Sequence, residues 1–321
     1  MKNIALIFGV TGQDGYYLTK HLSSLGYKVV GTSRDSSRIS TRLQELVDEE
    51  LLVLINAAPS DYRSVLKAIS ESKPKEVYNL SGQSSVGLSY DQPVETIESI
   101  LNTTLNILEA IKFLDKDIKF YNAGSSECFG ETTQAKATEN SLFKPLSPYA
   151  VAKSASANLV ASYRISYELK ACTGFLFNHE SPIRSPRFVT QKIVQSAALI
   201  KTGKTNILKL GNIDIYRDWG WAPDYVEAMH KMLQLDEPDD FIIATGKTVP
   251  LSYFIESAFS FFNLNWKDYV VADMSLGRPS DIVYSLGDPS KAKALLNWQA
   301  KYNVDDVVRE MCIAAGIQYI N

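Results

Sequence analysis

The first half of the chain alternates short apolar, β-branched runs with longer segments of helical periodicity. Six runs predict β-strands: NIALIFG (3–9), KVVGTS (28–33), LLVLIN (51–56), EVYNLSG (76–82), IKFYNAG (118–124) and ACTGFLFN (171–178). Helical patterns lie between them, at 14–25, 61–72, 94–113 and 148–168. Strands that are apolar throughout and alternate with helices predict an α/β fold, in which helices cover both faces of a parallel sheet.

The second half of the chain is less regular and contains more turn signals. Two turn-rich segments are GNIDIYRDWGWAPD (211–224) and SLGRPSD (275–281), and a last helical pattern lies near 302–316. We expect a smaller carboxyl-terminal α/β domain packed over the edge of the sheet. The predicted division assigns 1–177 to a cofactor-binding domain, with segments near 213–246 returning to it, and 178–321 mostly to a substrate-binding domain.

Composition excludes several classes of function. The chain has 321 residues, is 45% hydrophobic and 21% charged, and carries a formal net charge of −3, so no nucleic-acid partner is indicated. Cys128, Cys172 and Cys312 lie far apart, and the three histidines show no metal-ligand spacing, so neither disulfides nor a metal site is expected. No apolar run approaches the roughly 18 residues that span a membrane. The amino-terminal run ends in glycines rather than a cleavage site, which favours a cytoplasmic protein.

A glycine-rich segment follows the first predicted strand. Gly9, Gly12 and Gly15 in FGVTGQDGYYL form a G-x-x-G-x-x-G variant of the dinucleotide-binding fingerprint. Glycines permit the tight turn and the close backbone approach that bring a diphosphate to a helix amino terminus. The alternative is an ordinary strand–helix turn, but the position at the start of an alternating α/β pattern favours a Rossmann-type, doubly wound, dinucleotide-binding sheet.

The residues after the second strand indicate which dinucleotide is bound. NAD enzymes usually place an acidic residue there for the ribose hydroxyl, whereas NADP enzymes place an arginine for the 2′-phosphate. The run GTSRDSSR places Arg34 first, followed by Asp35 and, further on, Arg38. Because a phosphate needs positive charge and hydrogen-bond donors, this order favours NADP.

A tyrosine and a lysine share one face of a predicted helix downstream. Tyr149 and Lys153 in SPYAVAK are four residues apart, and an ammonium group near a phenol is expected to lower the tyrosine pKa and yield a base. A surface pair is the alternative for this spacing alone. Ser125 and Glu127 follow the fifth strand, whose carboxyl end faces the same crevice. These four side chains are therefore candidate catalytic residues.

At this point the chain resembles the extended short-chain dehydrogenase/reductase family and, within it, the GDP-mannose 4,6-dehydratases. The resemblance covers nearly the whole chain. It rests on the order and spacing of GVTGQDGYYL, YNLSGQSSVGLSYDQP, GSSECFG, SPYAVAK, LFNHESP, RFVTQKI, GNIDIYRDWGWAPDYVEAM and GRPSDI followed by LGDPSKAKALLNW.

The resemblance implies an internal redox reaction that converts GDP-mannose to GDP-4-keto-6-deoxymannose. Hydride passes from C4 of the sugar to NADP⁺ and returns to C6, with loss of water. Tyr149 takes the 4-hydroxyl proton, while Glu127 removes the C5 proton and then protonates the departing 6-hydroxyl. Ser125 hydrogen-bonds O4, and Lys153 holds the nicotinamide ribose and tunes Tyr149.

The resemblance also implies two sets of binding residues. The cofactor set is Gly9, Thr11, Gly12, Gln13, Asp14, Gly15, Arg34, Leu80, Ser81, Tyr149 and Lys153. The set that binds the GDP-sugar is Ser84, Ser85, Asn178, Val189, Lys192, Arg217, Arg278 and Asp281. His179 is a candidate for shaping the cofactor pocket. The family also implies a homo-oligomer, either a dimer or a tetramer.

Three departures from the family pattern leave alternatives open. Ala58 stands where the family has an acidic contact to adenine, although Asp61 is retained. Ser85 replaces a histidine of the sugar-facing loop, so another GDP-hexose such as GDP-N-acetylglucosamine is an alternative substrate. The paired arginines common after strand two are reduced to Arg34 and Asp35. Two other functions stay open. The protein could be an NADP-dependent nucleotide-sugar reductase or epimerase, or a catalytically silent NADP-binding sensor.

Overall fold

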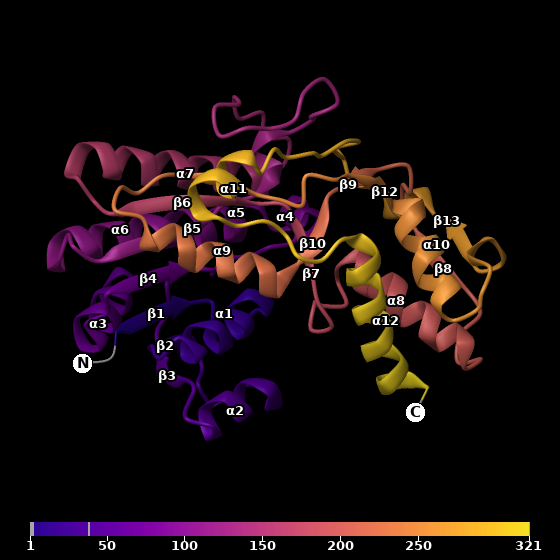
Figure 1. The fold of residues 1–321 in the computed structure, drawn as a ribbon, viewed down its shortest axis with the longest axis horizontal. Coiled ribbons are helices and arrows are strands. Elements are labelled where there is room, and N and C mark those ends of the chain that lie inside the picture. Colours follow the sequence, from indigo (N-terminus) through magenta and orange to yellow (C-terminus); the bar gives the residue numbers. More distant parts are fainter. Residues whose placement is uncertain (1–2, 38, 321) are drawn as a thin grey trace.

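A seven-stranded parallel sheet forms the centre of the fold (Figure 1). The computed structural model describes residues 3–37 and 39–320, so Arg38 lies outside the described residues. The strands are β1 (Ile4–Phe8), β2 (Lys28–Ser33), β3 (Val53–Asn56), β4 (Glu76–Asn79), β5 (Lys119–Ala123), β6 (Ala171–Leu176) and β11 (Phe241–Ile243). Their order across the sheet is β11-β6-β5-β4-β1-β2-β3, which confirms the six predicted strands and the doubly wound topology.

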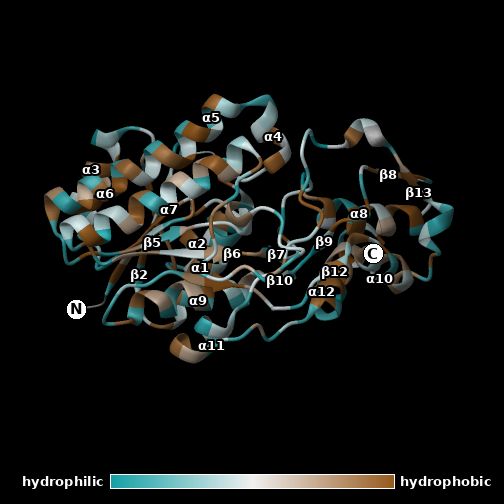
Figure 2. Cartoon of the chain, turned by 90° about the horizontal axis from the view of Figure 1, so that it is seen from above, coloured by the Kyte–Doolittle hydropathy of each residue, from teal (hydrophilic) through white to brown (hydrophobic). Residues whose placement is uncertain are grey.

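Helices cover both faces of the sheet because side chains alternate along each strand. Ile7 of β1 packs into the apolar core on one face, and Phe8 packs into the core on the other. Figure 2 shows the two helical layers on either side of the strands. The first layer contains α1 (Gln13–Ser24), α2 (Thr41–Asp48), α9 (Ala222–Gln234) and α11 (Ser290–Leu296); the second contains α3 (Tyr62–Ser72), α5 (Pro93–Ile97), α6 (Thr103–Leu114) and α7 (Pro148–Tyr167).

The helix predicted at 94–113 is interrupted by a π-helical turn. Residues Glu98–Asn102 form this turn between α5 and α6. Such turns are frequent at functional sites. Here the Ser99 hydroxyl accepts a hydrogen bond of 3.1 Å from the backbone N–H of Gln83, at the start of the loop 83–85. The π turn thus helps to fix a wall of the cavity described below.

A second lobe lies beside the carboxyl ends of the sheet strands, at the right of Figure 1. Its core is formed mainly by α8 (Val189–Lys201), α10 (Leu251–Phe261) and α12 (Val304–Tyr319). Asn303 and Asp306 form a capping box at the start of α12. Three pairs of short strands complete the lobe and its junction with the sheet: β7 (Asn178–Glu180) with β10 (Trp219–Trp221), β9 (Tyr216–Arg217) with β12 (Val249–Pro250), and β8 (Leu208–Leu210) with β13 (Val270–Ala272).

These short strands and β11 were not among the predicted strands. Each has only two or three residues, too few for a periodic pattern to be recognised. The division of the chain at 177/178 stays a prediction. Within residues 3–37 and 39–320, no helix has both the length and the apolar character that crossing a membrane requires.

Candidate active site

One cavity of about 910 Å³ lies between the carboxyl edge of the sheet and the second lobe. It brings together all four predicted catalytic residues: Ser125, Glu127, Tyr149 and Lys153. All eight predicted substrate-binding residues line it as well: Ser84, Ser85, Asn178, Val189, Lys192, Arg217, Arg278 and Asp281. Of the predicted cofactor residues, Asp14, Leu80, Ser81, Tyr149 and Lys153 line the cavity, whereas Gly9, Thr11, Gly12, Gln13, Gly15 and Arg34 are not among its lining residues.

At two glycines of the glycine-rich loop, Gly9 and Gly15, neighbouring backbone lies so close that a side chain would clash. Gly9 has φ +90°, and a Cβ there would lie 2.6 Å from the carbonyl carbon of Leu80. A Cβ on Gly15 would lie 2.5 Å from Cα of Val10. Gly12 is the N-cap of α1 and offers no side-chain cap, so the first N–H groups of the helix remain suited to an anion. This cradle fits the diphosphate of a dinucleotide.

Gln13 and Asp14, within the glycine-rich loop, form hydrogen bonds with the segment that follows β6. Gln13 Nε2 donates to His179 O at 3.1 Å, and Ser181 Oγ donates to Gln13 Oε1 at 2.6 Å. His179 Nδ1 lies 2.7 Å from Phe177 O, and its Nε2 lies 3.0 Å from an oxygen of Asp14. Both ring nitrogens face acceptors, which is the arrangement of a protonated imidazole. The His179 ring thus links Asp14, in the glycine-rich segment, to the backbone that follows β6; its role in shaping a cofactor pocket stays a prediction.

The pKa values of this pair move in opposite directions. Burial opposes ionisation of Asp14, but the charge and hydrogen bond of His179 outweigh burial and lower its pKa to about 2. Burial also disfavours the charged form of His179, but Asp14 outweighs this effect and raises the histidine pKa above 6.5. The Asp14 contribution to stability is present above pH 3.8 and is lost as the pH falls through about 2. The His179 contribution is complete below pH 6.5 and is lost as the pH rises through the folded pKa.

We expect Asp14→Asn to lower the free energy of unfolding by about 2 kcal/mol at pH 6, since the Asp14 pKa is lowered from 3.8 to about 2. The loss should shrink at alkaline pH, where His179 releases its proton in the wild type. Urea unfolding of both proteins at pH 6 and pH 9 measures this difference. A difference that is the same at both values would contradict the ion pair.

The four candidate catalytic residues come from the end of β5 and the start of α7. The Ser125 hydroxyl accepts from Glu127 N at 3.2 Å and caps the 3₁₀ turn Ser126–Phe129. Tyr149 lies in the first turn of α7, which begins at Pro148 with a Ser147 cap. Lys153 Nζ donates to Ala123 O at 2.7 Å and lies 5.8 Å from the centroid of the Tyr149 ring.

The prediction that the pKa of Tyr149 is lowered is wrong. Burial is the largest influence and raises the pKa of Tyr149 above its usual value, although a hydrogen bond with Ser125 acts against it. Burial also lowers the pKa of Lys153 to about 8, so its ammonium group stays mostly protonated at pH 7 but releases its proton more readily than an ordinary lysine. The sequence reveals the spacing of the pair but not the desolvation of both groups.

Glu127 is a half-buried carboxyl group among opposing charges. Burial raises its pKa, the charges of Arg217 and Arg278 lower it, and Asp281 raises it again; the net direction is upward. A carboxyl group whose pKa is raised toward neutrality can both remove and return a proton. The observed environment therefore suits the double role predicted for Glu127.

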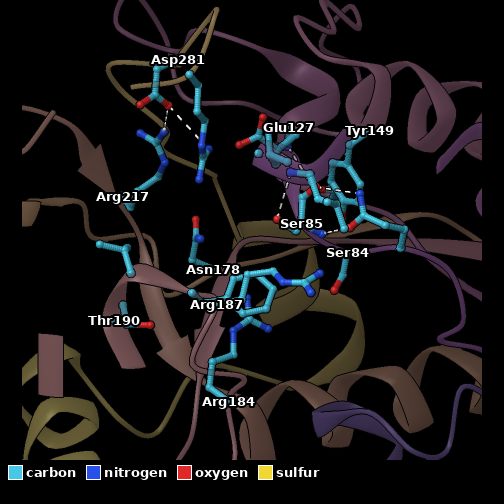
Figure 3. Close-up of a pocket in the computed structure, with 18 of the residues that line it drawn as sticks. Ser84, Ser85, Glu127, Tyr149, Asn178, Arg184, Arg187, Thr190, Arg217 and Asp281 are labelled. Carbon is cyan, nitrogen blue, oxygen red and sulfur yellow. Dashed lines mark hydrogen bonds and ion pairs between the residues drawn. The ribbon is translucent and has the colours of Figure 1, made fainter. Parts of the chain in front are cut away.

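A second cluster of charges lies at the top of the cavity in Figure 3. Asp281 Oδ1 is 3.1 Å from a terminal nitrogen of Arg217 and 3.7 Å from one of Arg278. Arg217 is only 5% exposed. Its neighbour Asp218 accepts hydrogen bonds from Thr245 N and Oγ1 and from Gly246 N, which fixes the strand that carries Arg217.

Sequence reasoning missed Arg184, Arg187 and Thr190 on the opposite side of the cavity (Figure 3). Arg184 Nε is 3.2 Å from Glu180 Oε2, and its guanidinium lies 3.6 Å from the centroid of the Phe188 ring. Thr190 Oγ1 donates to the same Glu180 oxygen at 2.8 Å. The sequence signal that could have indicated these residues is the cluster of basic residues in SPIRSPRF, directly after a strand.

Helix α8 begins at the cavity. Its N-cap, Phe188, makes no side-chain capping hydrogen bond, and Phe188, Val189 and Thr190 line the cavity. Lys192 also lines it, although its Nζ donates to Lys209 O at 2.7 Å. The first N–H groups of α8 thus have no side-chain cap and, like those of α1, are suited to an anion.

The chain is similar to proteins of one known family over nearly its whole length. Residues 6–311 match the family model described as GDP-mannose 4,6 dehydratase. The chain is 42% identical to GDP-mannose 4,6 dehydratase 1 of Arabidopsis thaliana, covering 97% of this chain and 89% of that one, and 40% identical to the human GDP-mannose 4,6 dehydratase, covering 97% and 90%.

Solved structures share the fold at lower identity. The UDP-glucose 4-epimerase of Thermus thermophilus with NAD has a TM-score of 0.85 at 22% identity, covering 97% of this chain and 98% of that one. RMD of Pseudomonas aeruginosa with NADPH has a TM-score of 0.80 at 20% identity, covering 99% of both chains.

Proposed function

The chain belongs to the GDP-mannose 4,6-dehydratase family, and from this premise we propose that it removes water from GDP-mannose to give GDP-4-keto-6-deoxymannose. The observation that carries the proposal is the cavity that brings Glu127 together with Ser125, Tyr149 and Lys153. Glu127 gives this cavity a half-buried carboxyl group that can accept and donate a proton beside the tyrosine and the lysine, as loss of water from the sugar requires.

We assign a role to each of the four side chains. Tyr149 accepts the proton of the sugar 4-hydroxyl, and Ser125 hydrogen-bonds O4. Glu127 removes the C5 proton and then protonates the departing 6-hydroxyl, so one carboxyl group acts as base and then as acid. Lys153 orients the nicotinamide ribose, and its positive charge stabilises the phenolate form of Tyr149. When bound, the nicotinamide cofactor supplies a reversible hydride acceptor, which makes a second substrate unnecessary.

The two uncapped helix starts suit the two diphosphates that this reaction brings together. We assign the α1 start, with the loop 9–15, to the cofactor, and the α8 start to the nucleotide sugar. Arg217, Arg278 and Asp281 are assigned to the guanosine end, with Asn178 and Lys192 at the diphosphate. Ser84 and Ser85 border the sugar.

We propose NADP as the dinucleotide. Arg34 is exposed at the carboxyl end of β2, while the carboxylate of Asp35 accepts hydrogen bonds from N and Oγ of Ser37. This leaves Arg34 as the group best suited to a 2′-phosphate.

Arg34→Ala is therefore expected to weaken NADP binding about tenfold while leaving NAD binding within about twofold, because one exposed phosphate contact is lost. Fluorescence titration with both dinucleotides measures the ratio. An equal change for NAD and NADP would assign Arg34 to general dinucleotide binding.

A panel of GDP-, UDP-, CDP- and dTDP-hexoses tests the reaction. Incubated with a catalytic amount of NADP, the protein should release a product lighter by one water from GDP-mannose, with no net consumption of cofactor. GDP-N-acetylglucosamine belongs in the panel because Ser85 replaces the histidine of the family pattern. Ser85 lines the cavity and caps α4 (Val86–Asp91) by accepting from Leu88 N at 3.3 Å. Stoichiometric NADPH oxidation would indicate a reductase, an isomeric product an epimerase, and no reaction a sensor.

We also propose that the enzyme is a homo-oligomer in the cytoplasm. Val94 and Ile97 on α5 and Val151 on α7 are exposed, and these two helices pack against each other, so a second copy of the chain could cover them. The cysteines Cys128, Cys172 and Cys312 are free and buried, which suits a reducing compartment. Light scattering on the purified protein distinguishes a dimer or tetramer from a monomer.

A further inference from the structure

A cluster of hydrogen bonds joins three elements that border the cavity. Tyr90 lies on α4, Leu146 lies just before α7, and Ser280 lies in the loop 277–281; we call these three residues the clasp. Ser280 Oγ donates to Leu146 O at 2.7 Å, so its lone pairs remain for the Tyr90 hydroxyl, which is 2.5 Å away. The Tyr90 oxygen is also 3.1 Å from Leu146 O. The Tyr90 hydroxyl thus contacts both other members of the clasp.

The loop 277–281 carries two groups that are assigned above to the guanosine end of the substrate. Arg278 and Asp281 form an ion pair of 3.7 Å, and Asp281 contacts Arg217 at 3.1 Å. Among the hydrogen bonds of residues 3–37 and 39–320, those that tie 277–280 to another element all involve Ser280. The position of residues 277–280 therefore depends on the clasp, while Asp281, at the end of the loop, is also held by Arg217.

The other ends of the clasp belong to the walls of the same cavity. Tyr90 is on the helix that follows the sugar-facing loop 83–85. Leu146 precedes Ser147, the N-cap of the helix that carries Tyr149. The side chain of Tyr90 itself lines the cavity. The clasp thus connects the nucleotide end of the site with the sugar loop and the catalytic helix.

We propose that Tyr90 is a positioning residue, which holds the loop 277–281 in the conformation that receives the nucleotide. This inference rests on the proposed function, because the loop matters only if Arg278 and Asp281 bind the guanosine end. A loop that is already ordered in the free protein loses less conformational entropy when the ligand binds. Removing the hydroxyl should weaken nucleotide binding and leave the chemical step unchanged.

The test compares Tyr90→Phe, Ser280→Ala and the double variant with the wild type. Each single change should raise the Kd for GDP, measured by titration calorimetry, and the KM for GDP-mannose about fivefold, as expected for one hydrogen bond. The kcat should stay within about twofold. The double variant should show about the same fivefold rise, because both changes break one unit.

Tyr253→Phe is the matched control, since the Tyr253 hydroxyl donates to Asp305 Oδ1 at 2.7 Å and is not among the cavity-lining residues. It should leave Kd, KM and kcat unchanged. The proposal is overturned if Tyr90→Phe leaves Kd and KM unchanged, if the effects multiply in the double variant, or if kcat and melting temperature fall together with affinity. A wild type that binds GDP but dehydrates no sugar would refute the proposed function, and the GDP titration would still decide on the clasp.

Discussion

Glu127→Gln is expected to lower the rate of water loss from GDP-mannose about a thousandfold, or by about 4 kcal/mol in activation free energy. The amide keeps the size of the side chain but cannot transfer the C5 proton or protonate the 6-hydroxyl. Tyr149 and Ser125 are untouched, so oxidation at C4 should still occur. On mixing with GDP-mannose and NADP, the variant should accumulate reduced nicotinamide, which absorbance reports directly.

Glu71→Gln is the control for this variant, because Glu71 is exposed on α3 and, within residues 3–37 and 39–320, forms an ion pair only with Lys67, at 3.9 Å across the helix surface. It should dehydrate GDP-mannose at the wild-type rate. Water loss by Glu127→Gln within tenfold of the wild-type rate would remove Glu127 from the role assigned to it.

Tyr149→Phe is expected to lower the same rate by a factor of about a hundred to ten thousand, the usual range for the loss of a general base. The proton of the 4-hydroxyl then has no acceptor, and oxidation at C4 stops before any hydride leaves the sugar. This variant should therefore form no reduced nicotinamide in a single turnover. The two variants are blocked at different steps, and absorbance distinguishes them.

Tyr167→Phe on the same helix serves as the control, since Tyr167 is 40% exposed and is not among the cavity-lining residues. Its rate should match that of the wild type. Accumulation of reduced nicotinamide in Tyr149→Phe would show that another group accepts the first proton.

The sheet could be predicted from the sequence because its inner strands are apolar throughout, as in ACTGFL of β6. The strand β11 could not, since the three residues of Phe241–Ile243 show no period and acquire their place only by pairing with β6. The π-helical turn at Glu98–Asn102 was likewise hidden within an ordinary helical pattern.

The candidate site was predicted where a motif fixes spacing and missed where tertiary packing decides. The positions of Tyr149 and Lys153 follow from one helix, but the direction of the Tyr149 pKa depends on burial by other elements. Arg184 reaches the cavity because its guanidinium packs on Phe188, a contact that the sequence does not reveal. The partner that charges His179, Asp14, is 165 residues away in the chain.

In the proposed reaction, hydride moves from C4 to C6 of one sugar molecule while Glu127 removes and returns protons. This transfer can be followed with GDP-mannose that carries deuterium at C4, incubated with the protein and a catalytic amount of NADP. We expect a product that has lost one water and carries the deuterium at C6, as mass spectrometry and NMR would show. Water loss without deuterium at C6, or deuterium released in free reduced cofactor, would contradict it.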